Sequence, residues 1–358
     1  MTLSSEGQMT QGMLSREDLL RALQAWMQSW RVIAPVRRER EVRFEDVDDV
    51  ASVVLDYGNT KHSLKSVYLP QVEQLLTYAR RRDNHNTITV TDPPSGQTML
   101  FAVRPCDARA RLMVDRVMVD GVCRDHYYAE RRDGIVVVGL ACETPRSTCF
   151  CGALDSGPYD PAGSDLLLRT AGDMYLVDIV TERGAELAQD LPLVEVDDEH
   201  QWLAKETQTA AEAALRPMER LVGIEDALEG LWDHEVWQDI AATCLACGTC
   251  TYLCPTCHCF AVEDRALAGG GERVRAWDSC MYAGFTLHAS GHNPRPDQGA
   301  RWRQRIMHKF SYLPENVDAY GCVGCGRCVV NCPVNLDIRR VLTRVREAAR
   351  VEAEESAS

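Results

Sequence analysis

The chain carries two copies of one cysteine run, and this repeat is its strongest chemical signal. Each copy has the spacing C-x2-C-x2-C-x3-C-P, with Cys244, Cys247, Cys250, Cys254 and Pro255 in the first and Cys322, Cys325, Cys328, Cys332 and Pro333 in the second. Three thiolates at steps of three residues can bind three irons of one [4Fe–4S] cubane, while the fourth cysteine binds the other cluster. The sequence therefore predicts two [4Fe–4S] clusters that exchange their fourth ligand.

This arrangement assigns four thiolates to each cluster. The predicted ligands are Cys244, Cys247, Cys250 and Cys332 for the first cluster, and Cys322, Cys325, Cys328 and Cys254 for the second. Structural zinc and buried thiols are the alternatives. Zinc sites usually combine two separated Cys-x-x-Cys pairs and do not require the final Cys-Pro, so the spacing favours iron–sulfur clusters.

Four further cysteines in the first half of the chain suggest a third site. They are Cys106, Cys142, Cys149 and Cys151. Cys106 and Cys142 each follow a predicted strand, so both can emerge at one edge of a sheet. Buried thiols are the alternative, because free cysteine is a common core residue. A third iron–sulfur cluster is therefore an expectation that the spacing alone does not decide.

The remaining cysteines have no ligand spacing. Cys257, Cys259 and Cys280 follow the first run, with His258 between the first two. We expect them to line the cluster pocket or to donate hydrogen bonds, and metal binding is the alternative. Cys123 lies in a polar segment and is predicted to be an ordinary thiol.

Composition limits the partners and the compartment. A net charge of −14 and a pI near 5.2 argue against nucleic acid, because binding to phosphates requires an excess of cations. Thiolates that bind iron must stay reduced, and disulfides compete with them in an oxidising space. The longest apolar run, residues 135–142, is too short to span a bilayer. These features predict a cytoplasmic protein without a membrane partner.

Patterning along the chain predicts an α+β protein in four parts. We expect a mobile leader over residues 1–12, an α/β domain over 13–201, a helical ferredoxin-type domain over 202–351 and an acidic tail over 352–358. Within the α/β domain, residues 69–78 are predicted as a helix, and residues 87–90 and 99–103 as a hairpin. A buried strand is predicted over residues 134–140.

A basic segment stands out in this acidic chain. Its cationic or imidazole side chains are Arg295, Arg301, Arg303, Arg305, His308 and Lys309. One interpretation is the solvated face of a helix. The other is compensation of the negative charge of thiolate-bound clusters, which raises their reduction potential. No G-x-G-x-x-G or Gly-Lys-Ser/Thr motif is present, so no nucleotide site is predicted.

With these motifs in view, the chain resembles the 4Fe–4S dicluster electron-transfer subunits. That family includes the beta subunit of cytosolic sulfhydrogenases, which are NAD(P)-linked [NiFe] hydrogenases, and the electron-delivering subunit of anaerobic sulfite reductases. The resemblance rests on FAVRPCDARA (101–110), ACETPRSTCFC (141–151), CLACGTCTYLCPTCHCF (244–260), WDSCMYAGF (277–285), ASGHNPRP (289–296), RIMHKF (305–310) and GCVGCGRCVVNCPVNLDI (321–338). His258 departs from the family, where an aromatic residue is expected.

The resemblance implies an electron relay without a catalytic centre of its own. In the hydrogenase version, the protein would dock on [NiFe] catalytic subunits and on a flavin subunit that reduces NAD(P). One alternative is the sulfite reductase component, which would deliver electrons to a sirohaem partner. A second alternative is a polysulfide-reducing subunit, in which Cys257, Cys259 or Cys280 would act beside a cluster.

Overall fold

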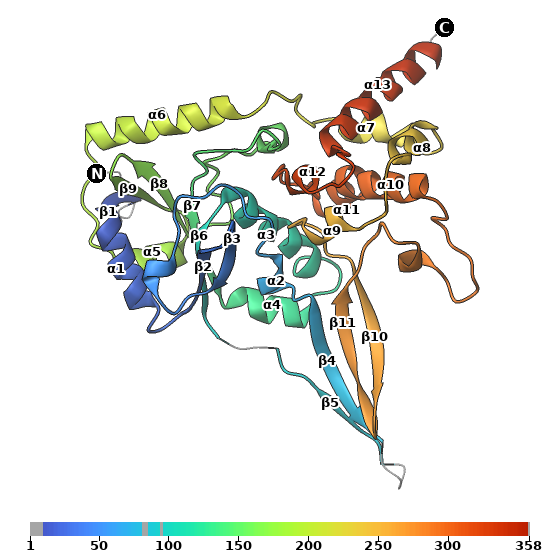
Figure 1. Cartoon of the computed structure of the whole chain (residues 1–358), viewed down its shortest axis with the longest axis horizontal. Coiled ribbons are helices and arrows are strands. Elements are labelled where there is room, and N and C mark those ends of the chain that lie inside the picture. The colour runs from blue at the N-terminus through green and yellow to red at the C-terminus, as the bar shows by residue number, and fades with distance from the viewer. Residues whose placement is uncertain (1–9, 81–84, 94–95, 357–358) are drawn as a thin grey trace.

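The computed structural model describes residues 10–80, 85–93 and 96–356 and contains two β-sheets (Figure 1). The larger is a seven-stranded mixed sheet in the order β1-β9-β8-β7-β6-β2-β3. Its strands are β1 Gln11–Ser15, β2 Arg31–Arg38, β3 Glu41–Asp46, β6 Thr98–Val103, β7 Ile135–Leu140, β8 Leu166–Ala171 and β9 Met174–Ile179. The central strand β7 is entirely buried, as predicted for residues 134–140, because both faces of the sheet are covered.

Short helices accompany this sheet. They are α1 Arg16–Trp26, α2 Lys65–Tyr68, α3 Pro105–Met118, α4 His126–Asp133, α5 Glu182–Ala188 and α6 Asp198–Ala214, with 3₁₀ turns Val50–Ser52 and Cys151–Leu154. Helix α1 begins where Ser15 Oγ accepts a hydrogen bond from Asp18 N at 3.1 Å. Strands β6 and β7 are parallel, so their carboxyl ends share one edge, with Cys106 in the first turn of α3 after β6 and Cys142 in the loop after β7.

A second, four-stranded antiparallel sheet joins distant parts of the chain. It has the order β10-β11-β4-β5, with β4 Val72–Ala79, β5 Thr87–Val90, β10 Phe260–Leu267 and β11 Gly270–Trp277. Figure 1 shows it projecting from the body of the molecule. Strand β11 pairs with β4 from Gly270↔Ala79 to Ala276↔Val72. The helix predicted over residues 69–78 is therefore wrong, because pairing with a segment from the other half of the chain makes it a strand.

Two related expectations also need correction. The predicted hairpin of residues 87–90 and 99–103 does not form, since β5 belongs to the small sheet and β6 to the large one. The region after residue 202 is not purely helical, because it contains β10 and β11.

The rest of this region is helical and packs around one apolar core. Its elements are α7 Ile224–Glu229, α8 Val236–Ala241, α9 Thr249–Tyr252, the 3₁₀ turn Ala283–Thr286, α10 Gln298–Met307, a π-helix His308–Tyr312, α11 Leu313–Val317, α12 Arg327–Val330 and α13 Ile338–Ser356. Trp237, Trp302 and Phe310 lie in its core. None of the helices in the described ranges is long and apolar enough to cross a membrane.

The ends of the chain differ from the predicted leader and tail. Residues 1–9 of the leader lie outside the described part, but Gln11 and Gly12 already belong to β1. Residues 352–356 of the predicted tail continue α13, and residues 357–358 lie outside the described part.

Candidate iron–sulfur centres

The two cysteine runs fold into the same local loop. Ala246 and Gly324 occupy equivalent positions with φ of 52° and 64°, and Gly248 and Gly326 follow with φ of 73° and 72°. The amide of Ala246 lies 3.4 Å from Cys244 Sγ, and its counterpart Gly324 N lies 3.5 Å from Cys322 Sγ. This left-handed backbone curls each loop so that its sulfurs face one side.

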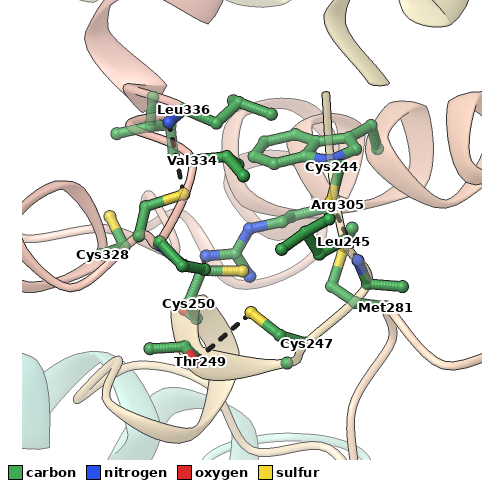
Figure 2. A pocket seen from close by; sticks show the side chains of 16 residues that line it. Cys244, Leu245, Cys247, Thr249, Cys250, Met281, Arg305, Cys328, Val334 and Leu336 are labelled. Carbon is green, nitrogen blue, oxygen red and sulfur yellow. Dashed lines mark hydrogen bonds between the residues drawn. The ribbon is translucent and has the colours of Figure 1, made fainter. Parts of the chain in front are cut away.

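The first loop surrounds a small cavity together with the last cysteine of the second run. Cys244, Cys247, Cys250 and Cys332 all line it, beside the apolar side chains of Met281, Trp302 and Leu336. Figure 2 shows this space, with the guanidinium of Arg305 beside the thiol of Cys250. The Leu336 amide donates to Cys332 Sγ at 3.2 Å. The four thiols predicted for the first cluster are thus brought to one place.

The second loop surrounds a neighbouring cavity. Cys254, Cys322, Cys325 and Cys328 line it, which are the four thiols predicted for the second cluster. Cys328 and Arg305 line both this cavity and the first. The two predicted cluster positions are therefore adjacent, with shared walls.

The four cysteines predicted for the third site also line one cavity. Cys106, Cys142, Cys149 and Cys151 come together there, and Cys325 of the second run completes the wall. Burial raises the pKa of Cys149 to about 11 and that of Cys151 to about 12. Thiols in such surroundings stay protonated unless a bound cation stabilises the thiolate. The donor set therefore fits an iron–sulfur cluster chemically.

Direct contacts tie this third cavity to the second. Phe150 N donates to Gly324 O at 2.8 Å, and Asn59 Nδ2 donates to Cys325 O at 2.9 Å. Asn59 Nδ2 also lies 3.9 Å from Cys106 Sγ. Sequence reasoning missed Asn59, because its partners are far away in the chain and no local motif marks it.

A buried ion pair fixes the same junction. Arg327, which follows Gly326, lies 2.6 Å from Asp107 Oδ2, and both side chains are 1% exposed. Arg327 also donates to the carbonyl and hydroxyl oxygens of Thr60. Asp107 lies in the first turn of α3, which begins after Arg104.

The basic segment is largely buried and does not form a solvated helix face. Arg305 is 2% and Lys309 5% exposed. Arg305 donates to Cys250 O at 2.8 Å and lies 3.6 Å from Cys257 Sγ, and Lys309 Nζ lies 3.6 Å from Cys254 Sγ. Burial alone would lower the pKa of Lys309, but the thiolates of Cys254 and Cys257 raise it above its usual value. This supports the charge-compensation interpretation.

The leftover cysteines separate into two groups. Cys257, Cys259 and Cys280 line a different cavity, of about 360 Å³, and Cys123 is exposed. Among the described residues, no three His, Cys, Asp or Glu side chains converge as ligands of a single metal ion. The cysteines line cavities instead, and a cubane is larger than one ion.

Comparison with known proteins identifies the family of the chain. The family described as "4Fe-4S dicluster domain" matches residues 243–336. The sulfhydrogenase 2 subunit beta of Pyrococcus furiosus is 33% identical over 321 residues, which cover 88% of this chain and 92% of the relative. The chain belongs to the 4Fe–4S dicluster electron-transfer subunit family. It is thus an iron–sulfur protein of the hydrogenase-subunit type. No solved structure matches it.

Proposed function

We propose that this protein is the beta-type subunit of a cytoplasmic, NAD(P)-linked [NiFe] hydrogenase and carries electrons over three [4Fe–4S] clusters in a row. The first cluster would be bound by Cys244, Cys247, Cys250 and Cys332, the second by Cys254, Cys322, Cys325 and Cys328, and the third by Cys106, Cys142, Cys149 and Cys151. The observation that carries the proposal is that consecutive cavities share walls. Cys328 lies between the first and second cavities, and Cys325 between the second and third.

The order of the three cavities suggests the route that electrons take through the protein. The second site lies in the middle, and the first has an exposed side at Cys247 and Leu245. Electron exchange with a partner protein requires a cluster near the surface, so the first site is the proposed contact point. The protein would supply ligands, burial and hydrogen bonds to sulfur, while the clusters carry single electrons.

Counts of iron and acid-labile sulfide test the three-cluster proposal. Anaerobically purified protein should contain about twelve irons per chain, since each cubane holds four. Cys149→Ser should lower the count by about four, and Cys123→Ser, the matched change at an exposed thiol, should leave it unchanged. About eight irons in the wild type, unaffected by Cys149→Ser, would reject the third cluster.

The relative's name supports the hydrogenase complex. The relative is named as a sulfhydrogenase subunit, and the comparisons give no specific support to the sulfite reductase alternative. Isolation of the complex from its own cells tests the assignment. We expect [NiFe] subunits and a flavin subunit to co-purify, and hydrogen gas to reduce the clusters. A sirohaem protein as the co-purifying partner would overturn it.

A further inference from the structure

Asn59 lies between the second and third cluster sites and contacts a predicted ligand of each. Its Nδ2 donates a hydrogen bond to Cys325 O at 2.9 Å and lies 3.9 Å from Cys106 Sγ. Cys325 is a predicted ligand of the second cluster and lines the second and third cavities. A side-chain amide nitrogen carries two hydrogens. One nitrogen can therefore donate to both sites at once.

The orientation of this amide follows from its partners. The nitrogen and oxygen of an asparagine side chain have nearly the same shape, so hydrogen bonding decides which is which. Cys325 O only accepts hydrogen bonds, so the atom that faces it must be Nδ2. The other amide atom, Asn59 Oδ1, is buried and has no hydrogen-bond partner among the described residues. Because a buried acceptor without a donor destabilises a fold, packing alone does not explain an amide at this position.

Contacts from two other parts of the chain hold Asn59 in place. Arg146 Nη2 donates to Asn59 O at 2.6 Å, and Arg327 Nε donates to the carbonyl oxygen of the next residue, Thr60, at 2.8 Å. The Asn59 side chain is buried, with 9% of the residue exposed. A donor that is fixed in this way faces its acceptors without reorganisation of the surrounding protein.

Iron binding increases the importance of Asn59. In the metal-free chain, Cys149 Sγ lies 3.8 Å from Cys325 O and can also donate to it. A thiol gives up its proton when it binds iron, so Asn59 is the donor of the two that remains in the loaded protein. The sulfur of Cys106 would then be a thiolate, which accepts hydrogen bonds more strongly than a thiol. The contacts of Asn59 are therefore strongest when the clusters are present.

We propose that Asn59 is a positioning residue of the electron relay, which donates to a ligand sulfur of the third cluster, fixes a neighbouring ligand of the second, and so raises the reduction potential of the third cluster. This inference rests on the proposed function, because it requires a cluster at the third site. A hydrogen bond to a ligand sulfur favours the reduced form of a cluster, which is the more negative form. Electron transfer from the second cluster to the third is thus more favourable with Asn59 than without it.

Redox titration followed by electron paramagnetic resonance tests this role in full-length, anaerobically loaded protein. The signal of the third cluster is the one that Cys149→Ser lacks. Asn59→Leu keeps the size of the side chain and removes the amide. At the potential where the wild-type third cluster is half reduced, its ratio of reduced to oxidised form should fall about fivefold, as expected for one neutral hydrogen bond. The second cluster should shift less, because Asn59 contacts the backbone of its ligand and not the sulfur.

A second variant and a control accompany this measurement. Asn59→Asp has the shape of asparagine and carries at most one proton, so it cannot donate to both partners, and an ionised carboxylate would add negative charge. The third cluster should therefore become at least as hard to reduce as in Asn59→Leu. Asn316→Leu, the control, removes an exposed amide that donates to Tyr312 O, and its three potentials should equal those of the wild type.

Iron content distinguishes the ways in which the inference can fail. Wild-type potentials in both Asn59 variants, at about twelve irons per chain, would overturn the role of Asn59 and leave the relay proposal intact. A loss of about four irons in both variants would also overturn it, because Asn59 would then be needed to form the site. About eight irons in the wild type would reject the third cluster itself, and the role of Asn59 with it.

Discussion

The two cysteine runs have the same spacing and nearly the same backbone, yet they occupy different surroundings. In the first run, Leu245 is 64% exposed and Cys247 is exposed. In the second, the equivalent of Leu245 is Val323, which is 3% exposed and lines the second cavity together with Phe150 of the cysteine-rich loop of the first half. Spacing therefore specifies the loop, and the residues between the cysteines decide whether the loop meets solvent or another part of the chain.

The largest expected difference concerns the residue that follows Gly248 in the first loop and Gly326 in the second. Arg327→Ala in the second run leaves Asp107 buried without its partner, which should cost about 3–5 kcal/mol of unfolding free energy. The equivalent Thr249→Ala removes one hydroxyl 3.4 Å from Cys247 Sγ and should cost about 1 kcal/mol or less. Urea unfolding under anaerobic conditions measures both. Equal losses would mean that the junction at Arg327 does not stabilise the fold.

The next difference concerns the residue two positions after the first cysteine of each run, Ala246 or Gly324. A Cβ on Gly324 would lie 2.4 Å from Cys151 N, so Gly324→Ala must move the loop that carries Cys149 and Cys151. We expect a loss of about 2–3 kcal/mol of unfolding free energy and about four irons from the third site. Urea unfolding and iron analysis measure the two losses.

The matched change in the exposed loop is Ala246→Gly. Ala246 already adopts a positive φ, which is mildly unfavourable for alanine, so glycine there should change stability by about 1 kcal/mol at most. Its iron content should equal that of the wild type. Iron loss in Ala246→Gly as large as in Gly324→Ala would contradict the different packing of the two loops.

The sequence predicted local features well, because covalent spacing and short-range backbone geometry determine them. The buried strand β7 follows from an apolar pattern within a few residues. The exchanged positions of Cys254 and Cys332 follow from the motif, and both line the cavities of the opposite run.

Features that depend on distant partners were not predictable in this way. Strand β4 reads as a helix by periodicity, and only β11 makes it a strand. The burial of Arg305 and Lys309 depends on thiolates far earlier in the chain, so their burial has no local signal. The Arg327–Asp107 pair joins residues 220 positions apart.

The loss of one buried positive charge should change the reduction potential of the second cluster more than that of the first. Lys309 contacts Cys254, a proposed ligand of the second cluster, so Lys309→Met should lower the potential of that cluster. A unit charge roughly 7 Å from the transferred electron is worth about 2.4 kcal/mol at an effective dielectric constant of about 20, or on the order of 100 mV. The first cluster should shift less. Redox titration followed by electron paramagnetic resonance measures both potentials.

Arg340 on α13 offers the matched control, because it is exposed. Arg340→Met removes the same charge where water screens it, and we expect both potentials to stay near their wild-type values. A shift as large as that of Lys309→Met would mean that overall charge, rather than the buried ammonium, sets the difference between the clusters.

The smallest expected effect is a change in the reduction potential of the first cluster alone. Gln298 at the start of α10 donates a hydrogen bond from Nε2 to Cys244 Sγ at 3.3 Å, in addition to the backbone amide contact that Cys244 Sγ and Cys322 Sγ both have. Gln298→Met keeps the length of the side chain and removes the donor. A neutral hydrogen bond is worth about 1 kcal/mol, so the potential of the first cluster should fall by about 40 mV while the second stays constant.

Gln201→Met, at an exposed position on α6, is the control for this change and should alter neither potential. The side-chain amide of Gln298 acts on one sulfur of the first run, and its influence should fade before it reaches the second cavity, because a dipole acts over a shorter range than a charge. If Gln298→Met moved both potentials equally, the two clusters would not be the separately tuned centres that their different surroundings imply.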